Sequence, residues 1–98
     1  MQEFVLVARY EVKDGSPEEV VDAALIESEA ALRDEQGCRA FDIMASSGDD
    51  SEGLFYEMYD DEAAFEEHRE TPHFSAFFSA IEDSTVEWTG PRYLRLSR

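Results

Sequence analysis

A glutamate and two histidines within residues 55–74 are the side chains of this chain best suited to acid–base chemistry. Glu57 lies in an apolar, aromatic segment, where burial would raise its pKa and let it move a proton near neutral pH. His73 follows Pro72 at an expected helix start, where unpaired backbone N–H groups favour a neutral imidazole and attract an anionic oxygen. Glu57 and His73 are therefore the principal catalytic candidates, with a purely structural role as the alternative for each.

His68 is the third catalytic candidate and the weaker of the two histidines. It is followed by Arg69 in an acidic helical segment, so we expect it nearer to solvent than His73. Two imidazoles and Glu57 are chemically able to hold a metal ion, but their spacing matches no established zinc signature. We therefore predict no metal site and no cofactor.

Several aromatic rings are candidates for contacting a substrate. Tyr10 and Tyr59 are favoured because a buried phenol needs a hydrogen-bond partner, which a ligand hydroxyl or Glu57 would supply. Phe74 is also retained as a candidate substrate contact. It shares the helical spacing of other phenylalanines whose pattern equally fits an ordinary packed core, namely Phe65, Phe77 and Phe78.

The elements that must position these residues follow from periodicity and capping signals. Alternation predicts strands at 3–12, 38–45 and 54–59, with a polar hairpin loop at 46–52. Ser16 and Pro17 begin a helix that should run to about Asp34, with an apolar face of Val20, Val21, Ala24, Leu25, Ser28, Ala31 and Leu32. Asp60 or Asp61 caps a short helix through His68, Thr71 caps the next, and a broken strand follows Ser84. The order strand, helix, strand, strand, helix, strand predicts an α+β, ferredoxin-like βαββαβ fold over a single domain, residues 1–98.

Apolar residues on both faces of the first and third strands predict a partner for the sheet. Helices cover one face, and an uncovered apolar sheet face would exceed what soluble monomers usually expose. The simplest cover is the same face of a second copy, so we expect a homodimer.

Charge and composition restrict the partners and the location. The chain has 24 acidic against 8 basic residues and a net charge of −16, which repels phosphate backbones, so we expect no nucleic-acid partner. It has no apolar run long enough to span a membrane, and Met1 leads directly into a strand pattern, so we expect a cytoplasmic protein without membrane contacts. A single lysine among so many carboxylates indicates either adaptation to high salt or a merely acidic enzyme.

Several motifs resemble the antibiotic biosynthesis monooxygenase family. They are Glu35, Gly37 and Cys38 before a strand, residues 41–43 within it, Tyr56, Glu57 and Tyr59, and above all His68 with residues 71–74. The resemblance covers nearly the whole chain and implies a dimeric α+β barrel. The family includes cofactor-free monooxygenases, heme-degrading enzymes and an autoinducer-2 isomerase, and it fixes fold better than reaction. The chain has no asparagine and its single tryptophan, Trp88, lies in the last strand, which disfavours heme degradation.

Three functions remain open. The first is a cofactor-independent monooxygenase of a quinol or polyphenol, in which Glu57 or a histidine deprotonates the substrate and His73 stabilises the enolate. The second is an isomerase of a small phosphorylated hydroxy-ketone, with Arg92 binding the phosphate; residues 89–92, Arg95 and Leu96 resemble the autoinducer branch. The third is a non-catalytic barrel that binds a small molecule.

Overall fold

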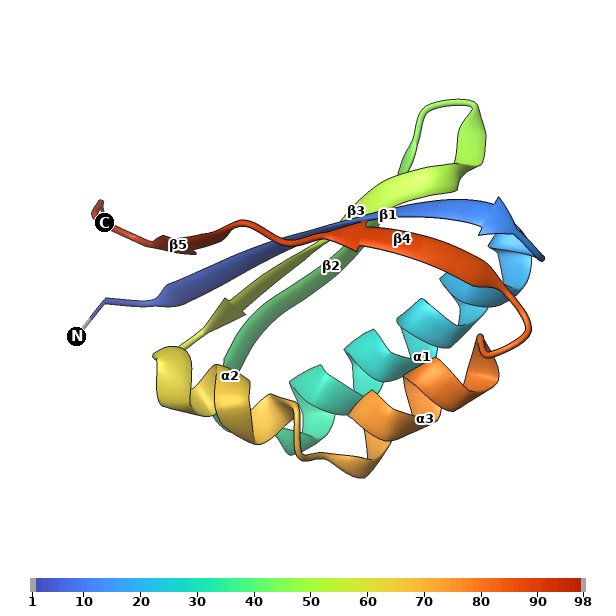
Figure 1. Ribbon diagram of the computed structural model, residues 1–98. Helices are drawn as coiled ribbons and strands as arrows, with labels where there is room; N and C mark the ends of the chain where they lie inside the picture. Colours follow the sequence, from blue (N-terminus) through green and yellow to red (C-terminus); the bar gives the residue numbers. More distant parts are fainter. Residues whose placement is uncertain (1, 98) are drawn as a thin grey trace.

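A computed structural model describes residues 2–97 as five strands and three helices (Figure 1). The elements are β1 (Phe4–Asp14), α1 (Pro17–Asp34), β2 (Cys38–Ser46), β3 (Asp49–Tyr59), α2 (Glu62–His68), α3 (Pro72–Ala80), β4 (Thr85–Thr89) and β5 (Arg92–Leu94). The predicted ferredoxin-like order is confirmed, with α2 and α3 together as the second helical segment and β4 and β5 as the broken last strand.

The sheet is antiparallel with strand order β2-β3-β1-β4, and β5 also pairs with β1. β4 pairs with Arg9–Asp14 of β1 and β5 with Phe4–Leu6, so the two short strands follow one another along a single edge of β1. Figure 1 shows α1, α2 and α3 all on one side of this sheet. The site candidates on β3 and on the helices therefore share the interior between the two layers.

Each helix begins at the predicted cap. The Ser16 hydroxyl accepts a hydrogen bond from Glu19 N, the Asp61 carboxylate from Ala64 N, and the Thr71 hydroxyl from Phe74 N. A cap of this kind typically contributes about 1 kcal/mol to helix stability, because it satisfies a backbone N–H that has no partner inside the helix. The capping residues thus fix where α2 and α3 start, and with them the positions of the two histidines.

The predicted hairpin between the second and third strands is confirmed, but its predicted loop, residues 46–52, is too long. β2 continues to Ser46 and β3 already starts at Asp49, so only two residues make the turn. Gly48, the second of these residues, has φ 82°, a left-handed conformation that glycine adopts without strain. Of the residues assigned to the loop, Ser46 and Asp49 pair with each other across the two strands, and the register of the ladder shifts between Ala45 and Ser46.

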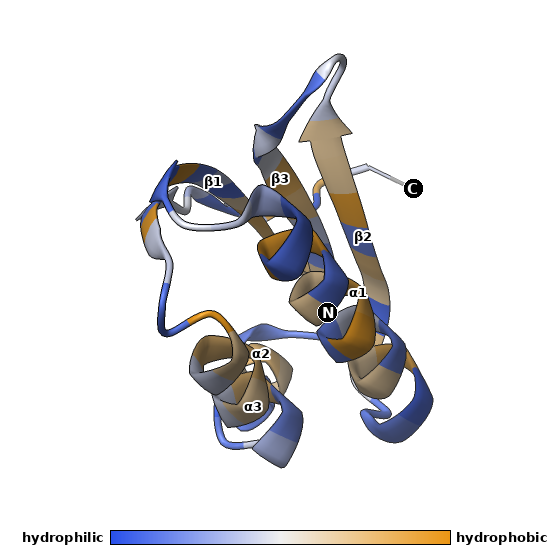
Figure 2. Cartoon of the chain, turned by 90° about the vertical axis from the view of Figure 1, so that its right-hand side faces the viewer, coloured by the Kyte–Doolittle hydropathy of each residue, from blue (hydrophilic) through white to orange (hydrophobic). Residues whose placement is uncertain are grey.

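The core lies between the sheet and the helices. The predicted inner face of β1 is confirmed: Phe4 and Tyr10 are buried, and Leu6, Ala8 and Val12 pack against the core. The predicted face of α1 is partly wrong, because Leu25 and Leu32 are exposed whereas Ala23, Glu27 and Ala30 are buried. Both hydrophobic and hydrophilic colours occur along α1 in Figure 2, as its amphipathic sequence requires. The buried stripe is made mostly of alanines, which let α1 approach the sheet closely.

The outer face of the sheet carries apolar side chains that no helix covers. Residues on that face include Val7 and its β3 partner Tyr56, and Leu54 beside Met44. Met44 and Tyr93 are exposed, while Val7, Leu54 and Tyr56 are half-buried. An open groove of about 440 Å³ on this side runs along β1, the β2–β3 hairpin and β4. Although it is the larger hollow, its walls hold neither Glu57 nor either histidine.

No helix among residues 2–97 combines the length and the apolar character needed to cross a membrane.

Candidate active site

An apolar cavity of about 170 Å³ lies between the sheet and the three helices. Most of its walls are aromatic or aliphatic side chains, and a few ionisable groups interrupt them. The lining comprises Leu6, Ala8, Phe55, Glu57 and Trp88 from the sheet, Glu27 from α1, Phe65 and His68 from α2, Arg69 just after it, and Phe74, Phe77 and Phe78 from α3. A mostly apolar cavity with a few converging polar groups is the usual form of a small-molecule site.

Glu57 is the ionisable group of β3 in this cavity. It is only 4% exposed, and its carboxylate oxygen Oε1 accepts a hydrogen bond of 2.7 Å from the Tyr59 hydroxyl. Burial raises the pKa of Glu57 to about 7, although the Tyr59 hydrogen bond and the positive charge of His68 partly oppose this rise. A carboxyl group with this pKa is able both to take and to give a proton near neutral pH, as general acid–base catalysis requires.

Tyr59 holds the Glu57 carboxylate rather than lining the cavity. Its side chain is fully buried, and burial together with the negative charge of Glu57 raises the pKa of its phenol far above the usual range. The phenol therefore stays protonated and remains a hydrogen-bond donor. Tyr59 is thus a positioning residue that fixes one oxygen of Glu57.

His68 is the most buried of the three catalytic candidates, with 1% of its surface exposed, so the expectation that it lies near solvent is wrong. Its imidazole lies between two carboxylates: Nε2 is 3.3 Å from Glu27 Oε2, and Nδ1 is 2.8 Å from Glu35 Oε2. Burial works against the charged imidazolium, but the hydrogen bonds and charges of Glu27 and Glu35 outweigh it and hold the pKa of His68 above its usual value. The position next to Arg69 was misleading, because α2 turns His68 toward the core, as it does Phe65.

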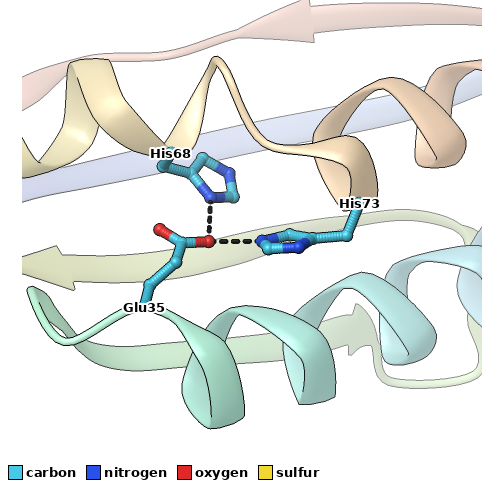
Figure 3. A group of neighbouring side chains, drawn as sticks. All are labelled: Glu35, His68 and His73. Atoms are coloured by element: carbon cyan, nitrogen blue, oxygen red, sulfur yellow. Dashed lines mark hydrogen bonds and ion pairs between the residues drawn. The ribbon is translucent and has the colours of Figure 1, made fainter.

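Glu35 joins His68 to His73 (Figure 3). The Oε2 atom of Glu35 accepts from Nδ1 of His68 and from Nε2 of His73. The three side chains come from the C-cap of α1, the last residue of α2 and the first turn of α3. These are also the described residues whose donor atoms gather closely enough to hold a metal ion.

Local backbone features bring the three chain segments together. The turn at Gly37 passes so close to α2 that a Cβ there would lie 2.6 Å from the Ala64 side chain, which places Glu35 against α2. The Thr71 hydroxyl donates to the His68 carbonyl (2.8 Å) while it also caps α3. The sequence therefore has glycine and threonine at the two places where the helix ends must meet.

The remaining predicted residues divide between the cavity and other places. Phe74 lines the cavity, whereas His73 lies outside its lining, beyond Glu35 and His68. The Tyr10 hydroxyl donates to the Asp50 carbonyl at the hairpin end of the sheet. Arg92 is exposed, and its guanidinium lies 5.2 Å from the centre of the Phe65 ring. Glu57, His68 and Phe74 are thus brought together, and Tyr10 and Arg92 are not.

Glu27 and Trp88 are cavity residues that sequence reasoning missed. A signal for Glu27 was present, because it lies three residues after Ala24 and four before Ala31, on the buried stripe of α1. A carboxylate at a buried helix position indicates a partner or a function. Trp88 had no comparable signal, since its contact with Phe55 and Phe77 depends on how β4 packs against α3.

The raised pKa of Glu57 predicts how Glu57→Gln changes stability with pH. The folded protein binds this proton more tightly than the unfolded chain does, since the pKa rises from 4.5 to about 7. The resulting stabilisation is fully present below pH 4.5 and is lost as the pH rises through 7. A neutral glutamine still accepts the Tyr59 hydrogen bond, so it should stabilise the fold relative to wild type above pH 7 by at most about 3 kcal/mol. Urea unfolding of both proteins at pH 5.5 and 8.5, at equal protein concentration, measures this gap, and a gap independent of pH would contradict the assigned pKa.

Comparisons with other proteins agree with the geometry of the fold. Residues 3–80 match the family model for antibiotic biosynthesis monooxygenases. A Nitrosomonas europaea structure named "putative antibiotic biosynthesis monooxygenase" is 26% identical, with a TM-score of 0.86 over 96% of this chain and 99% of that one. A Pseudomonas aeruginosa structure is 25% identical, with a TM-score of 0.84 over 99% of this chain and 97% of that one.

A third structure shares the fold at lower identity. SnoaB from Streptomyces nogalater, a cofactor-independent oxygenase, is 19% identical, with a TM-score of 0.73 over 100% of this chain and 95% of that one. A search of curated proteins finds no significant match. Because the family model covers most of the sequence, the chain belongs to the antibiotic biosynthesis monooxygenase family.

Proposed function

We propose that this protein is a cofactor-independent monooxygenase that acts on an uncharged quinol or polyphenol with a single aromatic ring. The observation that carries this proposal is Glu57, a buried carboxyl group with a pKa of about 7 in an apolar, ring-lined cavity. Such a group is suited to remove a phenol proton, and it lies where water is largely excluded. Family membership and the cofactor-independent oxygenase among the structural relatives support the same class of reaction.

The proposed reaction begins with proton transfer from a substrate hydroxyl to Glu57. The resulting electron-rich anion gives one electron to dioxygen, and the two radicals combine to a ring hydroperoxide. Loss of water then leaves a hydroxyquinone, so one atom of O₂ enters the ring and the other leaves as water with two hydrogens of the substrate. The protein contributes the base, the apolar walls and a fixed orientation for the ring.

Cavity size and charge support the choice of substrate. A volume of about 170 Å³ suits one aromatic ring, since a cavity of about 150 Å³ in another protein holds benzene. The carboxylates of Glu27 and Glu57 line the cavity together with His68 and Arg69, so the lining has no net positive charge that would select a phosphorylated hydroxy-ketone. Arg92, the residue expected to bind that phosphate, packs on the Phe65 ring outside the cavity lining. The geometry therefore favours the quinol substrate over the isomerase substrate.

Oxygen consumption tests the proposal directly. We expect the purified protein to consume O₂ with substituted hydroquinones, with a one-to-one ratio of O₂ to substrate and little hydrogen peroxide. Polycyclic quinols should react more slowly, because they exceed the cavity. Turnover of a phosphorylated hydroxy-ketone under nitrogen, with no oxygen uptake on any quinol, would favour the isomerase instead, and absence of both would favour a binding protein.

We also propose a homodimer in which the outer faces of two sheets pack together. Its support is the apolar outer face around Val7, Tyr56 and Met44, which the helices leave open. Light scattering at micromolar concentration should give about twice the chain mass of 11.2 kDa. Val7→Glu, which places a charge in that face, should give the monomer mass, whereas Glu29→Gln on the exposed side of α1 should not. A wild-type monomer in both dilute and molar salt would rule this interface out.

A further inference from the structure

We propose that Glu35, His68 and His73 form a binding site for a divalent transition-metal ion, with Zn²⁺ as the best chemical match. Their donor atoms, one carboxylate oxygen and two imidazole nitrogens, all lie within 4.8 Å of one another. Two imidazoles and one carboxylate from three chain segments are a ligand set that zinc commonly takes, with solvent as the fourth ligand. This site is separate from the proposed oxidation and does not depend on it.

The surroundings of His68 are those of a metal-binding histidine. Its Nε2 faces Glu27 Oε2 at 3.3 Å, so the proton on Nε2 is held by a carboxylate and Nδ1 is directed at Glu35. Metal-binding histidines usually donate their second N–H to a carboxylate or carbonyl, which fixes both the tautomer and the ring orientation. Glu27 would therefore act as the supporting carboxylate rather than as a ligand.

The charge balance also favours a cation. The side chains of Glu27 and Glu35 are 4% and 11% exposed, and their ion pairs are with the two imidazoles. A third buried carboxyl, Glu57, lies near enough for both glutamates to raise its pKa. Buried carboxylates require compensating positive charge, which the pairs with the imidazoles now provide, and a divalent ion bound in place of imidazole protons would provide it instead.

An ion has a route to this position and needs only small side-chain movements. His73 is 14% exposed at its side chain and Glu35 11%, so the outer side of the cluster reaches solvent. Ligand atoms of a tetrahedral zinc ion lie about 3.4 Å apart at zinc–nitrogen distances of about 2.1 Å. Glu35 Oε2 now lies between the two imidazoles as a direct hydrogen-bond acceptor, and it would withdraw by rotation of its flexible side chain. An ion there would lie directly behind His68, which forms one wall of the cavity.

The test is metal binding to the chelator-treated, full-length protein, and it needs no substrate. We expect calorimetric titration with Zn²⁺ in molar NaCl, which screens the acidic surface, to show one site per chain with a Kd of about 1 μM or tighter. Titration with Co²⁺ should produce the visible absorption of a four- or five-coordinate ion with nitrogen ligands. Saturating Zn²⁺ should also raise the melting temperature of the protein.

Matched variants assign the binding to this cluster. His73→Ala and Glu35→Gln each remove a ligand near the surface and should abolish the Co²⁺ absorption, and Glu27→Gln should weaken Zn²⁺ binding about 10- to 100-fold. Glu29→Gln, an exposed carboxylate on the same helix, should leave binding unchanged. The proposal is overturned if the wild-type protein binds neither ion. It is also overturned if His73→Ala binds both ions as the wild type does, because the ions would then be bound on the acidic surface. If a variant fails to fold, the titration of the wild-type protein still decides whether the chain binds the ion. A protein that binds zinc but oxidises no quinol would disprove the proposed oxidation and leave the metal site standing.

Discussion

Glu57→Gln should lower turnover of the quinol substrate by at least about a hundredfold while leaving the fold intact, because general acid–base groups typically contribute factors of this size. Glutamine has the same shape and still accepts the Tyr59 hydrogen bond, but it cannot take a proton. The loss should therefore fall on kcat, with KM little changed. Steady-state oxygen uptake over a range of substrate concentrations separates these two parameters.

The pH profile of the wild-type protein provides an independent check on the same residue. Since the base must be ionised, kcat/KM should rise as Glu57 loses its proton around pH 7, and Glu57→Gln should lack this rise. Glu29→Gln is the matched control for loss of one carboxylate, and it should behave as wild type. Near-normal turnover of a folded Glu57→Gln protein would show that Glu57 is structural and that the cavity acts by positioning and exclusion of water alone.

His68→Ala should be among the most destabilising single substitutions in the chain. It would remove the imidazole that pairs with both Glu27 and Glu35, leaving the buried Glu27 carboxylate without that partner and Glu35 with His73 alone. Breaking a buried pair in this way typically costs about 3–5 kcal/mol. For a domain of this size that corresponds to a fall in melting temperature of at least about 12 °C. Thermal unfolding followed by circular dichroism measures it.

An exposed ion pair in the same helix supplies the matched control for His68. Glu66→Gln breaks the surface pair with Arg69, whose side chains are about half exposed, and should change stability by less than about 1 kcal/mol. If His68→Ala cannot be obtained folded, His68→Gln is measured in the same way. A loss no larger than that of Glu66→Gln would show that the two carboxylates reach water once the imidazole is gone, and the buried cluster would then not be an important stabilising element.

The secondary structure of this chain is largely determined by local sequence signals. Ser16 with Pro17, Asp61, and Thr71 with Pro72 cap helices through short-range hydrogen bonds, so their effect is visible in the sequence itself. The alternation of residues 4–12 likewise placed one face of β1 in the core. The hairpin at 46–49 was the exception, because strand pairing overrode the loop preference of Ser and Asp residues.

The burial of Glu57 was also predictable from sequence, since its neighbours on the same strand face are Phe55 and Tyr59. Its pKa of about 7 required the structure, because that value depends on burial and on the opposing contributions of Tyr59 and His68. The resemblance of the motifs at 35–38 and 68–74 identified the family correctly, yet it did not show that these segments touch.

Only the tertiary structure decided how the two histidines are used. Sequence reasoning paired them with Glu57 and placed His68 near the surface, whereas they share Glu35, which lies 33 residues before His68 and 38 before His73. That contact depends on the close packing of Gly37 against α2 and on the turn that Thr71 makes between α2 and α3. Local signals fix where each helix begins and ends, but the side chains that meet across three helix ends are set by the packing of those helices, which no single stretch of sequence encodes.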